Sequence, residues 1–483
     1  MRDVWQSVRT LYSIPQASTI FVYMLQSVEY RAWPYLVWFW QTQRFGAVMH
    51  RRTLELTRAA RLLRGGLFAG MLLQLVAGLV LAYLGWQNVI VGGSWFGFAL
   101  ILSYPLVWAH AVGVVSMVGR IVVISPREAR HVVLAERIFA AHRGRRIAIA
   151  GSYGKTSMKE LLVTVLREGK KVAATPANQN VLSSHARFAS SLTGDEDIVL
   201  IEFGEGKPGD VKRFTDVVHP TDAIITGIAA AHLDRYKTVA AAARDIFSVA
   251  AHMPTDHVYV NTEAEEAVAY MHEGYQSYSR MGALGWTVQN ASTDITGTRF
   301  ELTQGTQTLR LTSQLVGIHQ VGPLAFAAAF GLEMGLTEAQ VVAGIGHTKP
   351  FEHRMQPYQL AGAWIIDDTY NGNLEGIRAG TELLASLAAK RKLYITPGLV
   401  EQGAQTAAIH RTVGNLIAKS KPDVVVLMQN SVTEYIQAGL AEAGYEGKSM
   451  LQTNPLDFYQ HLDHFVAAGD VVLMQNDWTD NYR

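Results

Sequence analysis

One short segment limits the folds open to this chain more than any other: Ile147–Lys159, with the sequence IAIAGSYGKTSMK. An apolar run typical of a buried strand ends in a glycine, and a helix-forming segment follows it. This order of strand, loop and helix is typical of a phosphate-binding loop, where glycines let backbone N–H groups approach phosphate oxygens. Lys155 then reaches the β- and γ-phosphates, and the Thr156 hydroxyl can bind Mg²⁺. The segment predicts an α/β domain that binds a nucleoside triphosphate.

The loop follows the short pattern G-x-x-G-K-[ST], because Ile149 stands where the longer pattern has its first glycine. A glycine-rich turn with an unrelated lysine is the alternative interpretation, and the loop alone leaves it open. The strand before the loop and the helix after it favour phosphate binding. The predicted loop residues are Gly151, Ser152, Tyr153, Gly154, Lys155, Thr156 and Ser157.

Composition narrows the class of protein further. The 483 residues are enough for two or three domains, and the net charge of +1 carries no nucleic-acid signature. The absence of cysteine excludes disulfides, thiolate metal sites and a cysteine nucleophile. The hydrophobic fraction of 49% is high for a soluble enzyme, and the excess is concentrated near the N-terminus.

Two uncharged stretches predict a helical membrane hairpin, with spans at about 66–84 and 95–118. Basic residues flank the pair and the short link between the spans has no charge, so the positive-inside rule places both ends in the cytoplasm. The flanking residues are Arg51, Arg52, Arg58, Arg61 and Arg64 before the first span, and Arg120, Arg127 and Arg130 after the second. A buried hairpin in a soluble helical domain is the alternative. A cleaved signal peptide is not expected, because the first span begins far from Met1.

Residues 1–50 are rich in aromatic residues but are interrupted by Glu29, Arg31 and Pro34. We interpret them as amphipathic helices that lie on the membrane surface or pack on the hairpin. Packing within the core of a small helical domain is the competing interpretation.

From about Arg145 onward, short β-rich runs alternate with helical segments, which predicts parallel sheets covered by helices on both faces. Residues 287–311 read instead as an antiparallel β excursion, and residues 322–344 as helical. A second α/β pattern begins after Arg354. We therefore expect a helical membrane region (1–140), a central ATP-binding α/β domain with a parallel sheet (141–350) and a Rossmann-like α/β domain (351–483).

Three further groups of polar residues follow strands. Glu202 ends the run IVLIEF, where parallel sheets bind ligands and where a carboxylate can hold Mg²⁺. His232 follows the run AIITGI and, taken alone, is more typical of a loop or capping residue. The segment 367–373, DDTYNGN, taken alone is typical of a turn at the end of a strand.

Together these motifs resemble the Mur ligase family. Their order is GSYGKTS, TPANQN, IEFGEGKPGD, ITGIAAAHLDRY, HRM, IIDDTYNGN and EQGAQTAAIHRTVG, from Arg145 to Tyr482. DDTYNGN and the spacing of Glu401, Gly403, His410, Val413 and Gly414 point to the branch that adds a D-alanyl-D-alanine dipeptide to a muramoyl tripeptide.

The resemblance implies an ATP-dependent, Mg²⁺-dependent amide ligase of cell-wall assembly that works through an acyl phosphate. It implies domain closure about a hinge near 349–354. Lys155, Glu202 and His232 are the implied catalytic residues, and Thr156, Glu202 and His232 the implied metal ligands. Gln320, Arg354 and Asp368 join the loop as nucleotide-binding residues. The implied substrate-binding residues are Asn178, Asn180, Arg244, Asn371 and Asn373.

The chain departs from the family pattern in four places. The N-terminal UDP-binding domain is not recognisable, and the membrane segment stands in its place. Ala243 stands at about the position of a lysine that is carbamylated in many family members. Ala243 cannot carry that group, although the neighbouring Arg244 could supply a positive charge. The adenine motif H-N-x-x-N reads His319 to Pro323, so that only Gln320 supplies an amide. A basic K-G-S-R-like segment reads Gln475-Asn476-Asp477-Trp478, which predicts loss of a cationic contact.

These departures leave the substrates open. The implied partners are a peptide or lipid-linked cell-wall precursor, an amino acid or dipeptide amine, the lipid bilayer and possible complexes with other cell-wall enzymes, with no nucleic acid. The implied location is the cytoplasmic membrane, with the catalytic domains facing the cytoplasm. Two alternatives remain: a ligase of another polymer, such as a polyglutamate-like chain, and a non-catalytic nucleotide-binding scaffold. Intact Lys155, Thr156, Glu202 and His232 favour catalysis, whereas Ala243, Pro323 and Trp478 favour the scaffold.

Overall fold

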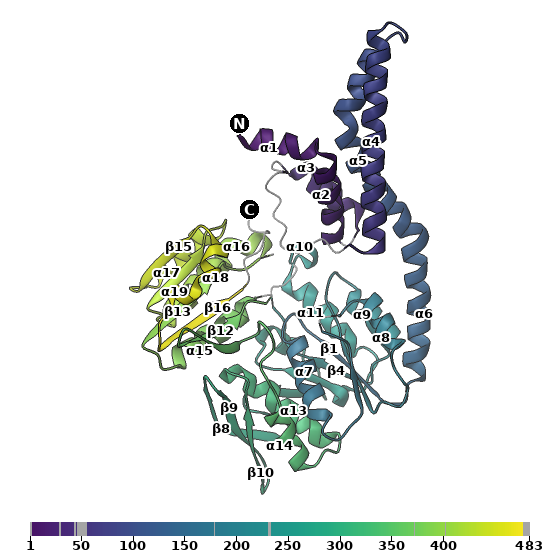
Figure 1. Ribbon diagram of the computed structural model, residues 1–483. Coiled ribbons are helices and arrows are strands. Elements are labelled where there is room, and N and C mark those ends of the chain that lie inside the picture. Colours follow the sequence, from purple (N-terminus) through teal and green to yellow (C-terminus); the bar gives the residue numbers. More distant parts are fainter. Residues whose placement is uncertain are drawn as a thin grey trace. The chain divides into compact units, whose positions relative to one another are not determined.

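The computed structural model describes residues 2–28, 30–42, 45, 56–177, 179–229, 233–370, 372–400 and 402–476. It divides into two compact units, Met1–Arg130 and His131–Arg483 (Figure 1). The first unit is helical and the second contains two β-sheets.

The first unit is built on an antiparallel hairpin of two long helices. Its helices are α1 (Arg2–Leu11), α2 (Ile14–Ser27), α3 (Ala32–Gln41), α4 (Arg58–Trp86) and α5 (Gly93–Gly119). A π-helical turn, Arg120–Ile124, continues α5 into α6 (Ser125–Ala141). Glycines let α4 and α5 approach closely: a Cβ atom on Gly97 would lie 2.5 Å from the carbonyl oxygen of Gly78. Inside the hairpin, the Trp108 indole donates to Gln74 Oε1 at 2.9 Å.

Helices α2 and α3 pack on this hairpin around a shared apolar core. Phe21, Leu25, Tyr35, Met71 and Val112 belong to one buried cluster, which draws on α2, α3, α4 and α5. Helices are present in this region as expected, and α2 and α3 pack on the hairpin; the shared core fits both packing on the hairpin and a small helical domain. Glu29 and residues 46–50 lie outside the described part of the chain.

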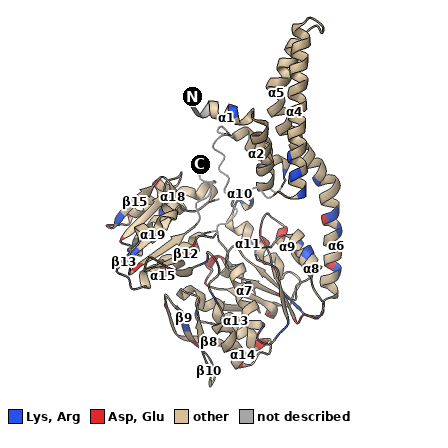
Figure 2. Cartoon of the chain, viewed as in Figure 1, with Lys and Arg blue, Asp and Glu red and all other residues tan. Residues whose placement is uncertain are grey.

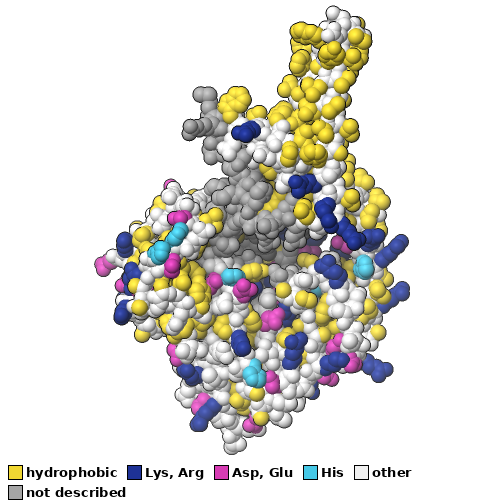
Figure 3. Space-filling view, in the orientation of Figure 1, with side chains coloured by type: hydrophobic (Ala, Val, Ile, Leu, Met, Phe, Trp, Pro, Cys, Tyr) yellow, Lys and Arg dark blue, Asp and Glu magenta, His cyan; other side chains and the backbone are white. Residues whose placement is uncertain are grey.

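The outer faces of the hairpin are apolar and exposed. Leu73 is 70% exposed, Phe96 72% and Leu102 65%. Figure 3 shows apolar side chains covering this part of the chain, and Figure 2 shows few charged residues along α4 and α5 beyond their base. By length and composition alone, two described helices could cross a membrane: Arg58–Trp86 and the continuous Gly93–Ala141.

The second unit begins with a ten-stranded sheet in the order β10-β9-β8-β7-β6-β5-β4-β1-β3-β2. Strands β1 to β6 pair in parallel, whereas β7 to β10 pair in antiparallel fashion. The strands are β1 (Arg145–Ala150), β2 (Val172–Ala174), β3 (Ile198–Glu202), β4 (Asp222–Ile225), β5 (Val258–Asn261), β6 (Gln276–Ser279), β7 (Gly282–Ala283), β8 (Trp286–Asp294), β9 (Gly297–Gln304) and β10 (Gln307–Ser313). The antiparallel excursion predicted for residues 287–311 is confirmed.

Both faces of this sheet are buried, as β1 illustrates. Ile147 and Ile149 belong to one apolar cluster, and Ala148 and Ala150 to another. Successive side chains of a strand point to opposite faces, so the two clusters are the two layers of a sandwich. The helices of this part are α7 (Lys155–Leu166), α8 (Leu182–Ala189), α9 (Asp210–Val218), α10 (Leu233–Tyr236), α11 (Val239–Phe247), α12 (Glu265–Val268), α13 (Val321–Glu333) and α14 (Glu338–Gly346).

The six-stranded sheet has the order β11-β12-β16-β13-β14-β15, in which all pairs except β11 with β12 are parallel. Its strands are β11 (Gln356–Leu360), β12 (Ala363–Asp368), β13 (Arg391–Thr396), β14 (Val424–Met428), β15 (Lys448–Gln452) and β16 (Asp470–Gln475). Its helices are α15 (Leu374–Ser386), α16 (Thr406–Lys419), α17 (Thr433–Glu442), α18 (Pro455–Gln460) and α19 (Leu462–Phe465). The predicted second α/β fold is thus present.

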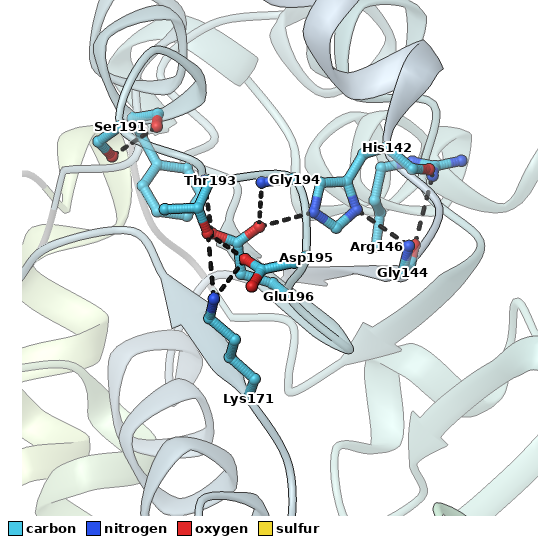
Figure 4. A network of polar contacts seen from close by, with 10 residues as sticks. His142, Gly144, Arg146, Lys171, Ser191, Thr193, Gly194, Asp195 and Glu196 are labelled. Carbon is cyan, nitrogen blue, oxygen red and sulfur yellow. Dashed lines mark hydrogen bonds and ion pairs between the residues drawn. The ribbon is translucent and has the colours of Figure 1, made fainter.

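A buried polar network joins the end of α6 to β1 (Figure 4). His142 Nε2 lies 3.0 Å from Glu196 Oε2, and the Gly144 amide donates to His142 Nδ1 at 3.1 Å. Arg146, in β1, donates to the His142 carbonyl at 2.7 Å. The strand that leads into the glycine-rich loop therefore starts from a fixed position.

Candidate nucleotide-binding site

A cleft of about 810 Å³ lies between the two sheets of the second unit. The carboxyl ends of β1, β3 and β12 lead into it, as expected for ligand sites of parallel sheets. Predicted residues from both α/β parts line the cleft: Ser152, Tyr153, Gly154, Lys155, Thr156, Ser157, Asn180, Glu202, Gln320, Arg354, Asp368 and Asn373. Residues far apart in the sequence are thus brought to one place.

The glycine-rich loop has the backbone that only glycine adopts easily. Gly151 and Gly154 have φ angles of 148° and 78°. A Cβ atom on Gly151 would lie 2.4 Å from the Thr226 hydroxyl oxygen. The segment that follows β4 holds the loop, because the Ser152 amide donates to the Gly227 carbonyl at 2.7 Å. Helix α7 begins at Lys155, so its N-terminal amides border the cleft.

Lys155 is paired with an acidic residue that the sequence did not single out. Its ammonium donates to the Gly151 carbonyl and lies 2.6 Å from Glu205 Oε2. Both side chains are almost fully buried. The signal in the sequence was weak: a glutamate between two glycines, just after β3.

Glu202 and Thr156 meet as predicted for a magnesium site. The Thr156 hydroxyl donates to Glu202 Oε1 at 3.0 Å, and the Asn180 amide donates to the same oxygen at 3.2 Å. Glu202 Oε2 is buried and accepts no hydrogen bond from the residues that the structure describes. Hydroxyl and carboxylate oxygens suit Mg²⁺, which commonly uses one or two carboxylates together with phosphates and waters. These two residues therefore fit the ion.

A second buried lysine, which the sequence analysis missed, supports Glu202. Lys159 has no exposed surface, and its Nζ atom lies 3.4 Å from Glu202 Oε2. It also donates to the Thr175 carbonyl at 2.8 Å and to the Ala177 carbonyl. Lys159 stands one helical turn after Lys155, a position at which an exposed lysine is the ordinary expectation.

The C-terminal α/β part contributes Arg354 and Asp368. The Arg354 guanidinium lies 4.5 Å from the centre of the Tyr370 ring, a cation–π contact. Asp368 accepts from the Met355 amide at 3.2 Å and from the Gln475 amide at 2.8 Å. Burial raises the pKa of Asp368 from 3.8 to about 7, although these hydrogen bonds and Arg354 oppose the shift.

Gln475 begins the segment in which the resemblance leads us to expect basic residues. Its side chain is buried and donates to the Gly376 carbonyl at 2.8 Å as well as to Asp368. Tyr394 donates to Gln475 Oε1 at 2.8 Å. A neutral amide therefore satisfies this position. Asp477 and Trp478 lie outside the described residues.

Two predicted binding residues line the cleft but also have structural partners. Asn373 caps α15, and its Oδ1 accepts from the Gly376 amide at 2.8 Å. Gln320 lies 3.0 Å from the ring of His319, whose pKa falls to about 4, first because it is buried and second because Arg280 is near. His319 is therefore neutral at physiological pH, and it also lines the cleft.

The remaining predicted residues are not placed in the cleft. Arg244 is exposed on α11 and does not line the cleft, while Ala243 is buried in the apolar core. The role of Arg244 stays a prediction. Asn178, His232 and Asn371 lie outside the described residues. Within the described ranges, no group of three or more His, Asp or Glu side chains is arranged to hold a metal ion.

The sequence of the chain is similar to sequences of known proteins. Residues 149–331 match the Mur ligase middle domain family. The UDP-N-acetylmuramoyl-tripeptide–D-alanyl-D-alanine ligase of Escherichia coli (strain K12) is 26% identical over 277 residues, which cover 56% of this chain and 61% of that enzyme. The enzyme of the same name from Mycobacterium leprae (strain TN) is 27% identical over 362 residues, 68% of this chain and 70% of that enzyme.

Solved structures show the same fold. MurF ligase from Thermotoga maritima, crystallised in complex with ADP, has a TM-score of 0.63 at 20% identity and covers 72% of this chain and 80% of its own. MurF from Acinetobacter baumannii has a TM-score of 0.62 at 20% identity, with 72% and 77% covered. The architecture and the glycine-rich loop are those of a Mur ligase. The chain thus contains a Mur ligase middle domain at residues 149–331, and over a longer stretch it is similar to MurF enzymes.

Proposed function

We propose that the chain is an ATP- and Mg²⁺-dependent carbon–nitrogen ligase that performs a MurF-like step of cell-wall peptide assembly. One observation carries the proposal: Lys155, Thr156 and Glu202 converge in the cleft that Arg354 and Asp368 line from the other α/β part. The matched segment spans only 61% of the Escherichia coli relative, so activity and substrates are proposed from the site and the named relatives together.

The proposed reaction has two steps. A carboxylate oxygen of the peptide substrate attacks the γ-phosphorus of ATP, which forms an acyl phosphate and releases ADP. The nitrogen of the incoming amine then attacks the acyl carbon, phosphate leaves, and the amine loses a proton. Phosphoryl transfer of this kind depends mainly on positioning and on neutralising charge.

Residues of the chain supply both the positioning and the neutralisation of charge. The Lys155 ammonium and the first amides of α7 bind the terminal phosphates. Thr156 and Glu202 would hold Mg²⁺, which neutralises phosphate charge when it is bound. Arg354, held over Tyr370, brings a second cation from the opposite wall. Closure of the two α/β parts about residues 349–354 would exclude water from the acyl phosphate.

The turnover assay compares the full-length chain with Lys155→Met and with Lys212→Met, a control lysine on the exposed face of α9. Phosphate release from ATP is measured with a muramoyl tripeptide and D-alanyl-D-alanine. We expect Lys155→Met to lose about 100-fold or more in rate, since it removes a charge aimed at the transition state, and the control to match wild type. ATP binding without turnover on this pair, or turnover only with glutamate as the amine, would support the scaffold or the polyglutamate-like ligase instead.

We also propose that α4 and α5 anchor the chain in the cytoplasmic membrane, with the α/β unit in the cytoplasm and the acceptor substrate presented at the bilayer. The exposed apolar faces of these helices support this, as do Arg58, Arg61 and Arg64 in the first turns of α4. A lipid-linked acceptor fits such an anchor.

The absence of cysteine makes the topology easy to test. Val91 is fully exposed in the link between the two helices, and Lys212 is exposed in the α/β unit. In intact cells, a membrane-impermeant maleimide should label Val91→Cys, whereas Lys212→Cys should react only after lysis. Labelling of Lys212→Cys in intact cells would contradict the proposed orientation, and labelling of neither before lysis would contradict a hairpin that crosses the membrane.

A further inference from the structure

The lysine of the glycine-rich loop already has an anionic partner within the chain. Lys155 can donate three hydrogen bonds. One goes to the Gly151 carbonyl, and another to Glu205 Oε2 at 2.6 Å. The side chains of Lys155 and Glu205 are 10% and 4% exposed, so solvent screens the pair only weakly. The ammonium that the proposed function assigns to phosphate is therefore occupied by a carboxylate.

The backbone on both sides of Glu205 is held in place. The Gly204 amide donates to the Asn180 carbonyl at 2.9 Å, and a Cβ atom on Gly204 would lie 2.7 Å from the Asn180 side chain. On the other side, Arg235 donates to the Gly206 carbonyl at 2.9 Å. Further along, the Gly209 amide donates to Asp245 at 2.9 Å. Since the segment is fixed at these points, the Glu205 carboxylate is set against Lys155 rather than placed there by a free loop.

We propose that Glu205 is an affinity-determining residue of the nucleotide site, because its carboxylate competes with phosphate for Lys155. The proposal rests on the proposed function of the loop. An arriving phosphate must either displace Glu205 from Lys155 or share the ammonium with it. In the first case an ion pair is broken. In the second, two anions lie against one cation in a poorly screened site. Both cases weaken nucleotide binding relative to a loop without this carboxylate.

The ion pair between Lys155 and Glu205 stabilises the loop when no nucleotide is bound. A buried lysine without a counter-charge is strongly unfavourable. Glu205 neutralises Lys155 in the nucleotide-free state, and the nucleotide takes over that role on binding. Glu205 therefore stabilises the free protein at the expense of nucleotide affinity, which also favours release of the product ADP.

The test measures binding of ATP to the full-length chain by calorimetry, with Mg²⁺ and with EDTA. Glu205→Gln keeps the shape and an acceptor oxygen but removes the charge, and Glu205→Asp keeps the charge but withdraws it from Lys155. Asp216→Asn on α9 is the control, since it changes net charge equally at an exposed site. We expect Glu205→Gln to bind ATP about tenfold more tightly than wild type in both conditions, Glu205→Asp to be intermediate, and Asp216→Asn to be unchanged.

Thermal unfolding provides a second readout that needs no turnover. Without nucleotide, Glu205→Gln should melt below wild type, because Lys155 has lost its counter-charge. Saturating ATP should raise its melting temperature by more than it raises that of wild type. Equal or weaker ATP binding by Glu205→Gln would overturn the proposal. If wild type itself binds no ATP, or binds it equally well after Lys155→Met, the proposed function fails instead, so the two failures are distinguishable.

Discussion

Glu196 is predicted to stabilise the junction between α6 and the sheet that carries the glycine-rich loop. Its Oε1 accepts from the Thr193 amide and the Thr193 hydroxyl, both at 2.8 Å. Its Oε2 accepts from the Gly194 amide at 2.8 Å and lies 3.0 Å from His142 Nε2 (Figure 4). Glu196→Ala removes this carboxylate from all four donors at once, although the Thr193 hydroxyl keeps Asp195 as an acceptor.

The expected loss of stability depends on whether each donor is buried or exposed. A buried donor left unpaired costs about 1–3 kcal/mol. His142 is buried and would bear that cost in full, whereas Thr193 and Gly194 are exposed, so water can replace most of what their amides lose. We therefore expect Glu196→Ala to lower the free energy of unfolding by about 3 kcal/mol, well below the sum of four buried hydrogen bonds.

The effect should depend on pH in a definite direction. Burial alone would raise the pKa of Glu196, but hydrogen bonds from the Thr193 backbone, His142 and the Thr193 hydroxyl outweigh it and hold the pKa well below 4.5. A carboxylate with a depressed pKa stabilises the fold above its unfolded-state value, and the contribution is lost as pH falls below about 4.5. Glu196→Gln should therefore show a shallower loss of stability in acid than wild type.

Hydrogen exchange of the β1 and β3 amides, followed by mass spectrometry, measures the opening free energy of this region in the full-length chain. The control is Asp216→Asn, an exposed residue on α9 that pairs with Lys212 outside this network and should leave exchange unchanged. Unchanged protection in Glu196→Ala, or an equal loss in the control, would refute the reasoning.

Two further predictions concern other parts of the chain. Asp368 has its pKa raised to about 7 by burial, so the folded state keeps a proton that the unfolded chain releases above 3.8, and stability should fall as pH rises between these values. Asp368→Asn should remove that decline, as measured by melting temperatures at pH 5 and pH 8. In the hairpin, a Cβ atom on Gly97 would lie 2.4 Å from the Ala82 amide nitrogen, whereas one on Gly66 would meet no described residue within 4 Å. Gly97→Val should therefore separate α4 from α5 and increase proteolysis, and Gly66→Val should not.

Much of the α/β fold could be predicted because it depends on local pattern. The apolar run Ile147–Ala150 predicts a buried strand, and the structure places its residues in two separate cores. The position of Glu202 at the carboxyl end of a strand could be read from the sequence, but its pairing with Thr156 came from the resemblance. The structure brings the two together because β1 and β3 are neighbouring parallel strands.

The residues that were missed depend on long-range packing. Lys159 is buried because the segment that follows β2 supplies the Thr175 and Ala177 carbonyls, and nothing in the helix itself indicates that cover. Gln475 was interpreted as the loss of a cation, yet it is bonded to Asp368, Tyr394 and Gly376, three partners that sequence order does not bring together.

Lys159 and Glu205 together explain how the loop can be folded before a nucleotide arrives. Glu202 lies against the buried Lys159, and Lys155 against the buried Glu205, so both lysines at the start of α7 have a partner of opposite sign. The two pairs differ in one respect. Lys159 is also bonded to two backbone carbonyls and cannot leave without exposing them, whereas Glu205 competes for a lysine that borders the cleft. Glu202 therefore keeps its partner when a phosphate enters, and Lys155 exchanges its own. In this arrangement the metal ligand is oriented permanently, and the phosphate-binding cation is released only to a ligand that carries enough negative charge to replace Glu205.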